Sequence, residues 1–388
     1  MADPTFPNPA GPNSPGSNPG GSNPAGPKLV ASSSHSYTAL YAALKSMPGF
    51  ERLERKDLEP AGYGGTTHDH VRIRGTGFVL RLPRTSQWDL AAEINLAYQA
   101  TGFRRAAQSG HTPRLVALLP PDAELPMGGL IVEEIAGRKP RLPDDLGAIA
   151  ECLRAVHGLQ MPPPGRRPPL LAPSHPLDHL ISTVNAQAPF LERAGLSDAT
   201  LRPIRAELDW ARDYAGAHRT DASPQSLILT DTHPGNFVVD GAGKAWFVDL
   251  EKTMYSLPAI DLAHATLYTS TRFDPEADKA LDADDTAGFY RAYLSKLERR
   301  AAFALMPWLA PVRRFVYLRT LTWCAKWQVE SQSGNGRSRD HLDAATRAHM
   351  DAILKDFFEP ATIERVRSEW LGEKSRAWRE IASLVGAS

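Results

Sequence analysis

The chain has 388 residues, of which 42% are hydrophobic and 23% are charged, an ordinary globular composition. Its 44 lysines and arginines balance 44 aspartates and glutamates, so no global field would draw the protein to nucleic acid or to an anionic membrane. The two cysteines, Cys152 and Cys324, lie far apart in helix-like patterns, so we expect no disulfide framework and a reducing, cytoplasmic location.

Residues 1–36 form the first distinct segment, which is rich in proline, glycine, asparagine and serine. It has almost no apolar side chains to bury, so we expect a disordered tail. It also lacks the basic flank and apolar stretch of a secretory signal. A later apolar segment, at 301–318, is interrupted by two prolines and two arginines, which favours packed helices over a membrane span.

Residues 37–137 are expected to form a small lobe rich in strands. Two apolar-alternating runs, 70–74 and 78–84, flank a glycine-containing turn and predict a β-hairpin. An amphipathic helix over 89–101 and a buried strand over 128–135 complete this lobe.

Residues 138–388 are expected to form a larger, mostly helical lobe. Leu146, Ile149, Leu153 and Val156 recur at the spacing of one helix face, and later segments repeat that spacing. One hairpin interrupts the helical pattern at 237–249, where the chain turns at the sequence DGAG.

A polar loop, LTDTHPGNF at 229–237, lies directly before this hairpin. Asp231 and Asn236 lie five residues apart in the loop, and the antiparallel return of the hairpin brings Asp249 back toward them. Taken singly, these are common turn residues. Together, their order is that of the catalytic loop and metal-binding aspartate of protein kinases, and their oxygens suit Mg²⁺.

The stretches DTHPGNF, FVDLEK and PAIDLAHA resemble the aminoglycoside phosphotransferase and choline kinase-like small-molecule kinases. The resemblance implies an α+β fold of the two-lobed protein kinase-like type. It further implies Asp231 as catalytic base, Asn236 and Asp249 as metal ligands, and Glu251 as a support for the metal through water. Asp261 would brace the catalytic loop, a structural task.

This chain departs from the family pattern directly before Asp231. The family usually has His-Gly there, whereas this chain has Leu229 and Thr230. A threonine restricts the backbone more than a glycine does. The alternative to an active kinase is therefore a catalytically weak pseudokinase or nucleotide-binding module.

The small lobe is expected to bind the nucleotide. Gly64 and Gly65 lie in a loop that could place backbone N–H groups near phosphates, although glycine pairs also mark ordinary turns. Alternation along 78–84 puts Val79 and Arg81 on one face, toward the base and the phosphates, with Glu93 as the ion-pair partner of Arg81. The alternatives are a solvated edge strand and a surface helix position.

Glu134 and Ile135 follow the last predicted strand of the small lobe, where the backbone would hydrogen-bond adenine. The cofactors implied are ATP and Mg²⁺. The acceptor would be a hydroxyl of a small molecule such as an aminoglycoside, an amino alcohol or a sugar-like compound. No oligomeric state is predicted.

Two features bear on the acceptor. The acidic run at 273–285 would suit a polycation, and Trp323 with Trp327, one helical turn apart, would suit a quaternary ammonium group. The ordinary interpretations are a solvated loop and core packing between helices. The sequence leaves these alternatives open.

Overall fold

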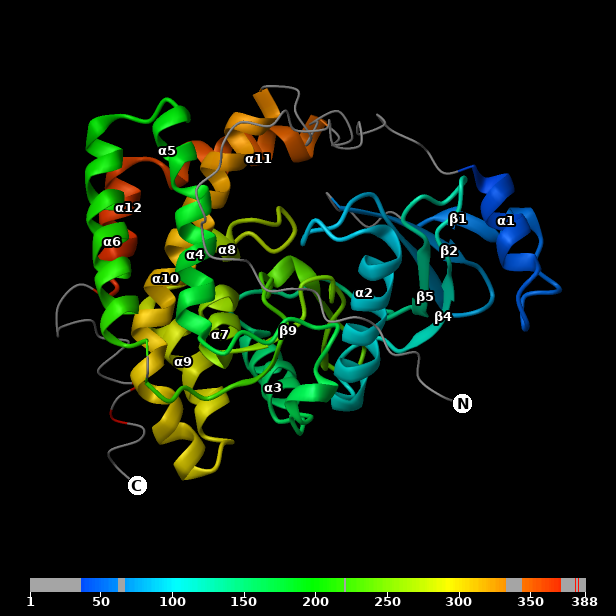
Figure 1. Cartoon of the computed structure of the whole chain (residues 1–388), viewed down its shortest axis with the longest axis horizontal. Coiled ribbons are helices and arrows are strands. Elements are labelled where there is room, and N and C mark those ends of the chain that lie inside the picture. The colour runs from blue at the N-terminus through cyan, green and yellow to red at the C-terminus, as the bar shows by residue number, and fades with distance from the viewer. Residues whose placement is uncertain are drawn as a thin grey trace, which may run out of the picture.

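The structure is a computed structural model that describes residues 36–61, 67–219, 221–332 and 344–370, together with 381 and 383. All but the last residue of the predicted tail, and both Gly64 and Gly65, lie outside these ranges. Figure 1 shows a sheet-rich part at one end of the molecule and a helical part at the other, with α2 between them.

The small lobe is built on a five-stranded antiparallel sheet in the order β1-β2-β3-β5-β4. The predicted hairpin is confirmed, because β2 and β3 pair with Ile73 opposite Phe78. Helix α1 packs on this sheet through Leu40 and Leu44, which share a buried cluster with Leu80 of β3. The strands are β1 (Leu58–Pro60), β2 (His68–Ile73), β3 (Phe78–Pro83), β4 (Leu115–Leu119) and β5 (Gly129–Glu133), and α1 spans Tyr37–Lys45.

Helix α2 (Ala92–Ala106) connects the small lobe to the rest of the molecule. Leu96 and Phe103 on its inner face belong to the large core, in which they join residues of the helical lobe. The hydroxyl of Tyr98 donates to the carbonyl of Thr253 at 2.8 Å. The helix therefore fixes the position of the small lobe against the segment around Thr253, which follows the hairpin predicted at 237–249.

The large lobe is helical, as predicted. The four predicted apolar residues of α3 are all buried, and a second set with the same spacing is buried in α11. The helices are α3 (Leu146–His157), α4 (Pro176–Gln187), α5 (Pro189–Arg193), α6 (Asp198–Ala217), α7 (Pro258–Thr266), α8 (Tyr268–Thr271), α9 (Ala283–Leu294), α10 (Arg299–Gln332), α11 (Ala344–Phe357) and α12 (Pro360–Arg367).

Helix α10 differs from the expectation of separate packed helices at 301–318. It runs without a break through Pro307 and Pro311. Prolines in a helix interior remove hydrogen bonds, but α10 packs against α4, α5, α6 and α7, and this packing outweighs the local cost. The described residues contain no helix that is both long and apolar enough to cross a membrane.

Four short strands lie within the helical lobe. Strands β7 (Phe237–Val239) and β8 (Ala245–Phe247) form the predicted hairpin, and β6 (Ser226–Ile228) pairs with β9 (Met254–Ser256). Arg138, just after the small lobe, exchanges both backbone hydrogen bonds with Val239. A Cβ on Gly137 would clash with the Val239 carbonyl, so glycine is required where the lobe connection crosses the hairpin.

Candidate active site

The loop between β6 and β7 is held from beneath by Asp261 of α7. This fully buried carboxylate accepts hydrogen bonds from the backbone N–H groups of Leu229 and Thr230, each at 2.7 Å. The imidazole Nε2 of His157 lies 3.0 Å from the same carboxylate. The predicted bracing role of Asp261 is confirmed, and His157 supports it from α3.

Thr230 has a φ of 72°, in the left-handed region that a β-branched residue rarely adopts. Its hydroxyl donates to the carbonyl of Lys252 at 2.9 Å. Its own carbonyl accepts a hydrogen bond from Arg319 Nη2 at 3.0 Å. With the bond to Asp261, these contacts hold a strained backbone directly before Asp231.

Asp231 forms an ion pair with Lys252, whose Nζ lies 2.7 Å from Oδ2. Burial alone would raise the pKa of Asp231, but the charge and hydrogen bond of Lys252, together with His233 and His264, outweigh burial and hold that pKa well below its usual range. Burial also opposes the charge on Lys252, yet Asp231 and Glu251 raise the pKa of its amine. At neutral pH the pair is therefore a carboxylate and an ammonium.

Two histidines lie close to Asp231. His264 Nδ1 is 3.7 Å from Asp231 Oδ1, and the ring of His233 lies 6.3 Å from that of His264. Burial lowers the pKa of both imidazoles, which favours their neutral forms at pH 7. His233 packs on Phe273, which agrees with a structural part for this residue in the loop.

Asn236 is tied to the loop and to the hairpin. Its side-chain Nδ2 donates to the backbone carbonyl of Asp231 at 2.9 Å, and its backbone carbonyl accepts from the backbone N–H of Val248 at 3.0 Å. Its side-chain oxygen, Oδ1, is the atom that would bind a metal. Gly235 lies against Asp274, at a place where a Cβ would clash with that side chain. The spacing of Asp231 and Asn236 is thus set by contacts on both sides of the turn.

Asp249 follows β8 and pairs with Arg81 of β3, with Nη2 2.6 Å from Oδ1. Arg81 also donates to the carbonyl of Val248 at 3.0 Å. The predicted pair of Arg81 with Glu93 is wrong. Helix α2 begins at Ala92, so Glu93 lies in its first turn and is exposed, whereas Asn95 and Gln99 face inward.

Glu251 is buried against the small lobe. Its Oε1 accepts a hydrogen bond from the hydroxyl of Thr67 at 3.1 Å, and His68 Nδ1 lies 3.7 Å from Oε2. Within the described residues Oε2 has no hydrogen-bond partner, although the side chain is almost fully buried. Burial raises the pKa of Glu251 to about 8, and the negative charge of Asp249 adds to this effect.

These donors fit a divalent cation. One ligand atom each from His68, Asp249 and Glu251 lie within 4.8 Å of one another. An unpartnered buried carboxylate oxygen beside a second carboxylate is an arrangement that a cation would stabilise. His68 was not anticipated as a possible ligand.

Three further residues were predicted on the nucleotide side. Val79 is buried. The backbone N–H of Glu134 already donates to the carbonyl of Gly77 at 2.8 Å, and its carboxylate pairs with Arg72. Ile135 is only partly buried and lies outside any helix or strand.

The two features expected to bear on the acceptor have ordinary places in the fold. In the acidic run, Asp274 pairs with Lys139 and Asp278 pairs with Arg272. Trp327 is buried in the large core, which confirms core packing for that residue. Trp323 remains partly exposed and packs edge-on against Phe273, with ring centroids 5.8 Å apart.

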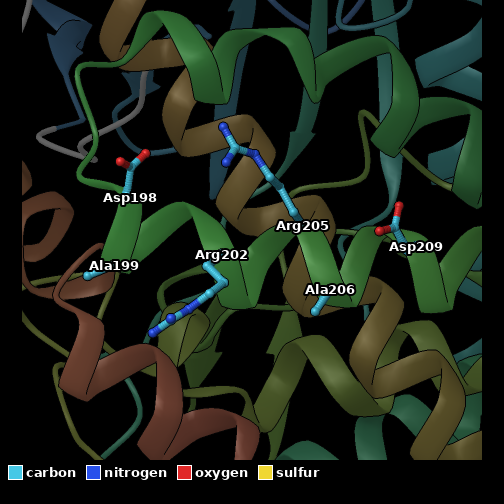
Figure 2. A pocket seen from close by; sticks show the side chains of 6 residues that line it. All are labelled: Asp198, Ala199, Arg202, Arg205, Ala206 and Asp209. Carbon is cyan, nitrogen blue, oxygen red and sulfur yellow. The ribbon is translucent and has the colours of Figure 1, made fainter.

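A surface hollow of about 600 Å³ lies elsewhere, on the outer face of α6 (Figure 2). All of the residues that line it are exposed, and they are Asp198, Ala199, Arg202, Arg205, Ala206 and Asp209. It contains none of the groups of the catalytic loop. The chemistry of the molecule is therefore expected at the loop and not in this hollow.

Lys252 and Arg319 lie near Asp231, and neither was predicted as a site residue. Lys252 directly follows the DLE stretch, so the signal was its adjacency to the predicted metal ligands. Arg319 lies on α10, 89 residues from the loop residue that it contacts, and no local pattern indicates it.

A small antiparallel sheet joined to a helical lobe, with an Asp-Asn loop and a hairpin aspartate between them, defines a protein kinase-like phosphotransferase. The chain belongs to the phosphotransferase enzyme family, whose family model matches residues 58–310. No curated protein matches the sequence.

Solved structures share the fold at low sequence identity. A choline/ethanolamine kinase family protein from Mesorhizobium loti is 19% identical, covering 90% of this chain and 99% of that one, with a TM-score of 0.54. An ethanolamine kinase from Plasmodium vivax is 14% identical over 84% and 91% of the two chains, with a TM-score of 0.56. A GDP complex of aminoglycoside 2'-phosphotransferase-IIIa is 15% identical over 82% and 98%, with a TM-score of 0.53. Family and fold together make this chain a small-molecule phosphotransferase.

Proposed function

We propose that the protein transfers the terminal phosphoryl group of ATP to a hydroxyl of a small molecule, with Mg²⁺ as the divalent cation. The observation that carries the proposal is the fixed position of Asp231. It is a carboxylate held by Lys252, with Asn236 tied to its own backbone and Asp249 at the end of the adjoining hairpin. The GDP bound to one similar structure supports a nucleotide donor.

In this proposal Asp231 orients the acceptor hydroxyl. The low pKa of Asp231 keeps it ionised, so it accepts a hydrogen bond from the hydroxyl and receives the proton as the new oxygen–phosphorus bond forms. The bond from the terminal phosphorus to its bridging oxygen breaks, and the nucleoside diphosphate leaves. Lys252 occupies Oδ2 and so leaves Oδ1 for the hydroxyl.

Asn236, Asp249 and Glu251 would hold the cation, which neutralises phosphate charge when bound. Arg81, whose two Nη atoms bond Asp249 and the Val248 carbonyl, would place its positive charge near the phosphates. Val79 would lie against the base, and the backbone near Glu134 and Ile135 would meet its edge.

The test is release of ADP or GDP by the purified protein with Asp231→Asn as the variant. We expect turnover to fall by about a thousandfold or more, because the hydroxyl loses its proton acceptor, while nucleotide affinity changes little. Asp213→Asn, at an exposed position of α6, is the control. Equal turnover in wild type and Asp231→Asn would refute the proposal. Nucleotide binding without any turnover in the wild type would favour the pseudokinase alternative.

A further inference from the structure

Arg319 lies on the face of α10 that meets the catalytic loop. Its Nη2 donates to the carbonyl of Thr230, the residue before Asp231. The side chain is only partly exposed, and Asp231 and Asp261 both lie near enough to act on its pKa, which burial lowers. Within the described part of the chain, no carboxylate reaches ion-pair distance from this guanidinium.

Several arginines in comparable surroundings are paired with acids, whereas Arg105 fills its donors with backbone carbonyls and the Tyr255 hydroxyl. Arg81 pairs with Asp249, Arg313 pairs with Glu369, and Arg314, on the same helix as Arg319, pairs with Glu207. A guanidinium has five N–H donors, and one backbone carbonyl occupies only one of them. Since a partly desolvated charge without a counter-ion is costly, Arg319 has capacity for an anion.

The groups around Arg319 favour an anion over a cation. Lys252 brings a second positive charge to Asp231, while Asp261 is occupied by the loop backbone. Trp323 lies one helical turn after Arg319, on the same side of α10, and is also partly exposed.

We infer that Arg319 binds an anionic group of the acceptor, a carboxylate or a phosphate, and so places the acceptor hydroxyl against Asp231. The inference rests on the proposed function. The planar fork of arginine matches either anion through two parallel hydrogen bonds. Arg319 is then a specificity-determining residue, and the acceptor is a hydroxy acid or a phosphorylated polyol and not a polyamine.

The experiment compares acceptors that differ only in charge. Glycerol, glycerate, glycerol 3-phosphate and serinol form one set, and glucose, gluconate, glucose 6-phosphate and glucosamine form another. Nucleoside diphosphate release is measured for wild type, Arg319→Met, Arg319→Lys and the control Lys326→Met. Lys326 lies on the same helix, seven residues on, and pairs with Glu330. Circular dichroism and nucleotide affinity check the fold of each variant.

We expect kcat/KM to be highest for an anionic member of a set. Comparing the carboxylate compound with the phosphate compound in each set then shows which of the two anions Arg319 binds. Arg319→Met should raise the KM for that acceptor by about 10- to 100-fold, the effect of losing hydrogen bonds to a charged group, with a smaller change in kcat. Arg319→Lys should lie between, and Lys326→Met should match wild type.

Preference for a neutral or cationic acceptor would overturn the inference, as would an Arg319→Met KM equal to that of Lys326→Met. So would nucleotide binding with no turnover of any anionic acceptor. If Arg319→Met does not fold, Arg319→Lys decides the matter through the same KM comparison. Failure of the wild type to bind nucleotide at all would instead count against the proposed function.

Discussion

The two carboxylates at the centre of the site are each paired with a cation, but the cations come from different lobes. Asp231 pairs with Lys252 within the large lobe, whereas Asp249 pairs with Arg81 on β3 of the small lobe. In the proposed function, the acceptor side is therefore built within one lobe, and the nucleotide side depends on contact between two. Changes on the two sides should alter different measured quantities.

The largest effect is expected from Asp261→Asn, which tests whether the loop that carries Asp231 depends on the Asp261 carboxylate. An asparagine cannot accept both backbone hydrogen bonds and keep its contact with His157 without leaving a buried polar group unpaired. We expect a loss of about 3–5 kcal/mol in the free energy of unfolding and a fall in kcat. Thermal unfolding and steady-state kinetics measure the two quantities.

Asp209→Asn, on the exposed face of α6, is the matched control for Asp261→Asn. It should change the melting temperature little, because exposed ion pairs contribute little. If both variants melt alike, the loop does not depend on Asp261.

The nucleotide side is tested by Arg81→Met. Loss of the charged contacts with Asp249 and the Val248 carbonyl should raise the nucleotide KM by about 10- to 100-fold, with less effect on the acceptor KM. Glu93→Gln is the control and should change neither KM by more than about twofold, because Glu93 is exposed. A large effect of Glu93→Gln on the nucleotide KM would mean that Glu93 does act with Arg81, contrary to the structure.

A smaller effect, dependent on pH, is expected from Lys252→Met in the protein without nucleotide. The pKa of Asp231 is lowered in the folded state, so the pair stabilises the fold at pH values above about 4, the ordinary aspartate value, and this contribution fades as the pH falls further. In the variant, burial raises that pKa. The melting temperature should therefore differ by about 2–4 °C near pH 7, and the difference should shrink as the pH falls below about 4.

The matching control is Lys326→Met, which should change the melting temperature little at any pH, because its pair with Glu330 is partly exposed. A difference between wild type and Lys252→Met that stays constant from pH 7 to well below pH 4 would contradict the ionised pair.

The arrangement of the loop at 229–237 and its hairpin could be predicted from sequence because its parts are close in the chain. Asp231 and Asn236 share one loop, a single short hairpin returns Asp249, and Asp261 follows within the next helix. A tight turn of known type leaves little freedom in where these residues lie. Lys252 lies in the same stretch, but the direction of its side chain depends on the backbone conformation after β8, which the sequence pattern does not indicate.

The nucleotide side could be predicted only in part, because it depends on the rotational phase of α2 and on contacts between distant segments. Packing of α2 decides which of its residues face inward, and it buries Asn95 and Gln99 and leaves Glu93 exposed. The α2 residue beside Arg81 is Phe103, whose ring centroid lies 5.6 Å from the guanidinium carbon. Arg319 illustrates the same limit, since only the packing of α10 brings it to the loop.

The smallest effects are expected from substitutions of Thr230, whose backbone is strained in the left-handed region. Thr230→Val keeps the branched side chain but leaves the Lys252 carbonyl without its donor, which should cost about 1–2 kcal/mol. Thr230→Gly loses the same bond and adds freedom to the unfolded chain, but it removes about 1–2 kcal/mol of strain at a φ of 72°. These terms nearly cancel, so the glycine variant should melt above the valine variant and close to wild type. The reverse order in thermal unfolding would mean that the left-handed backbone before Asp231 is not strained.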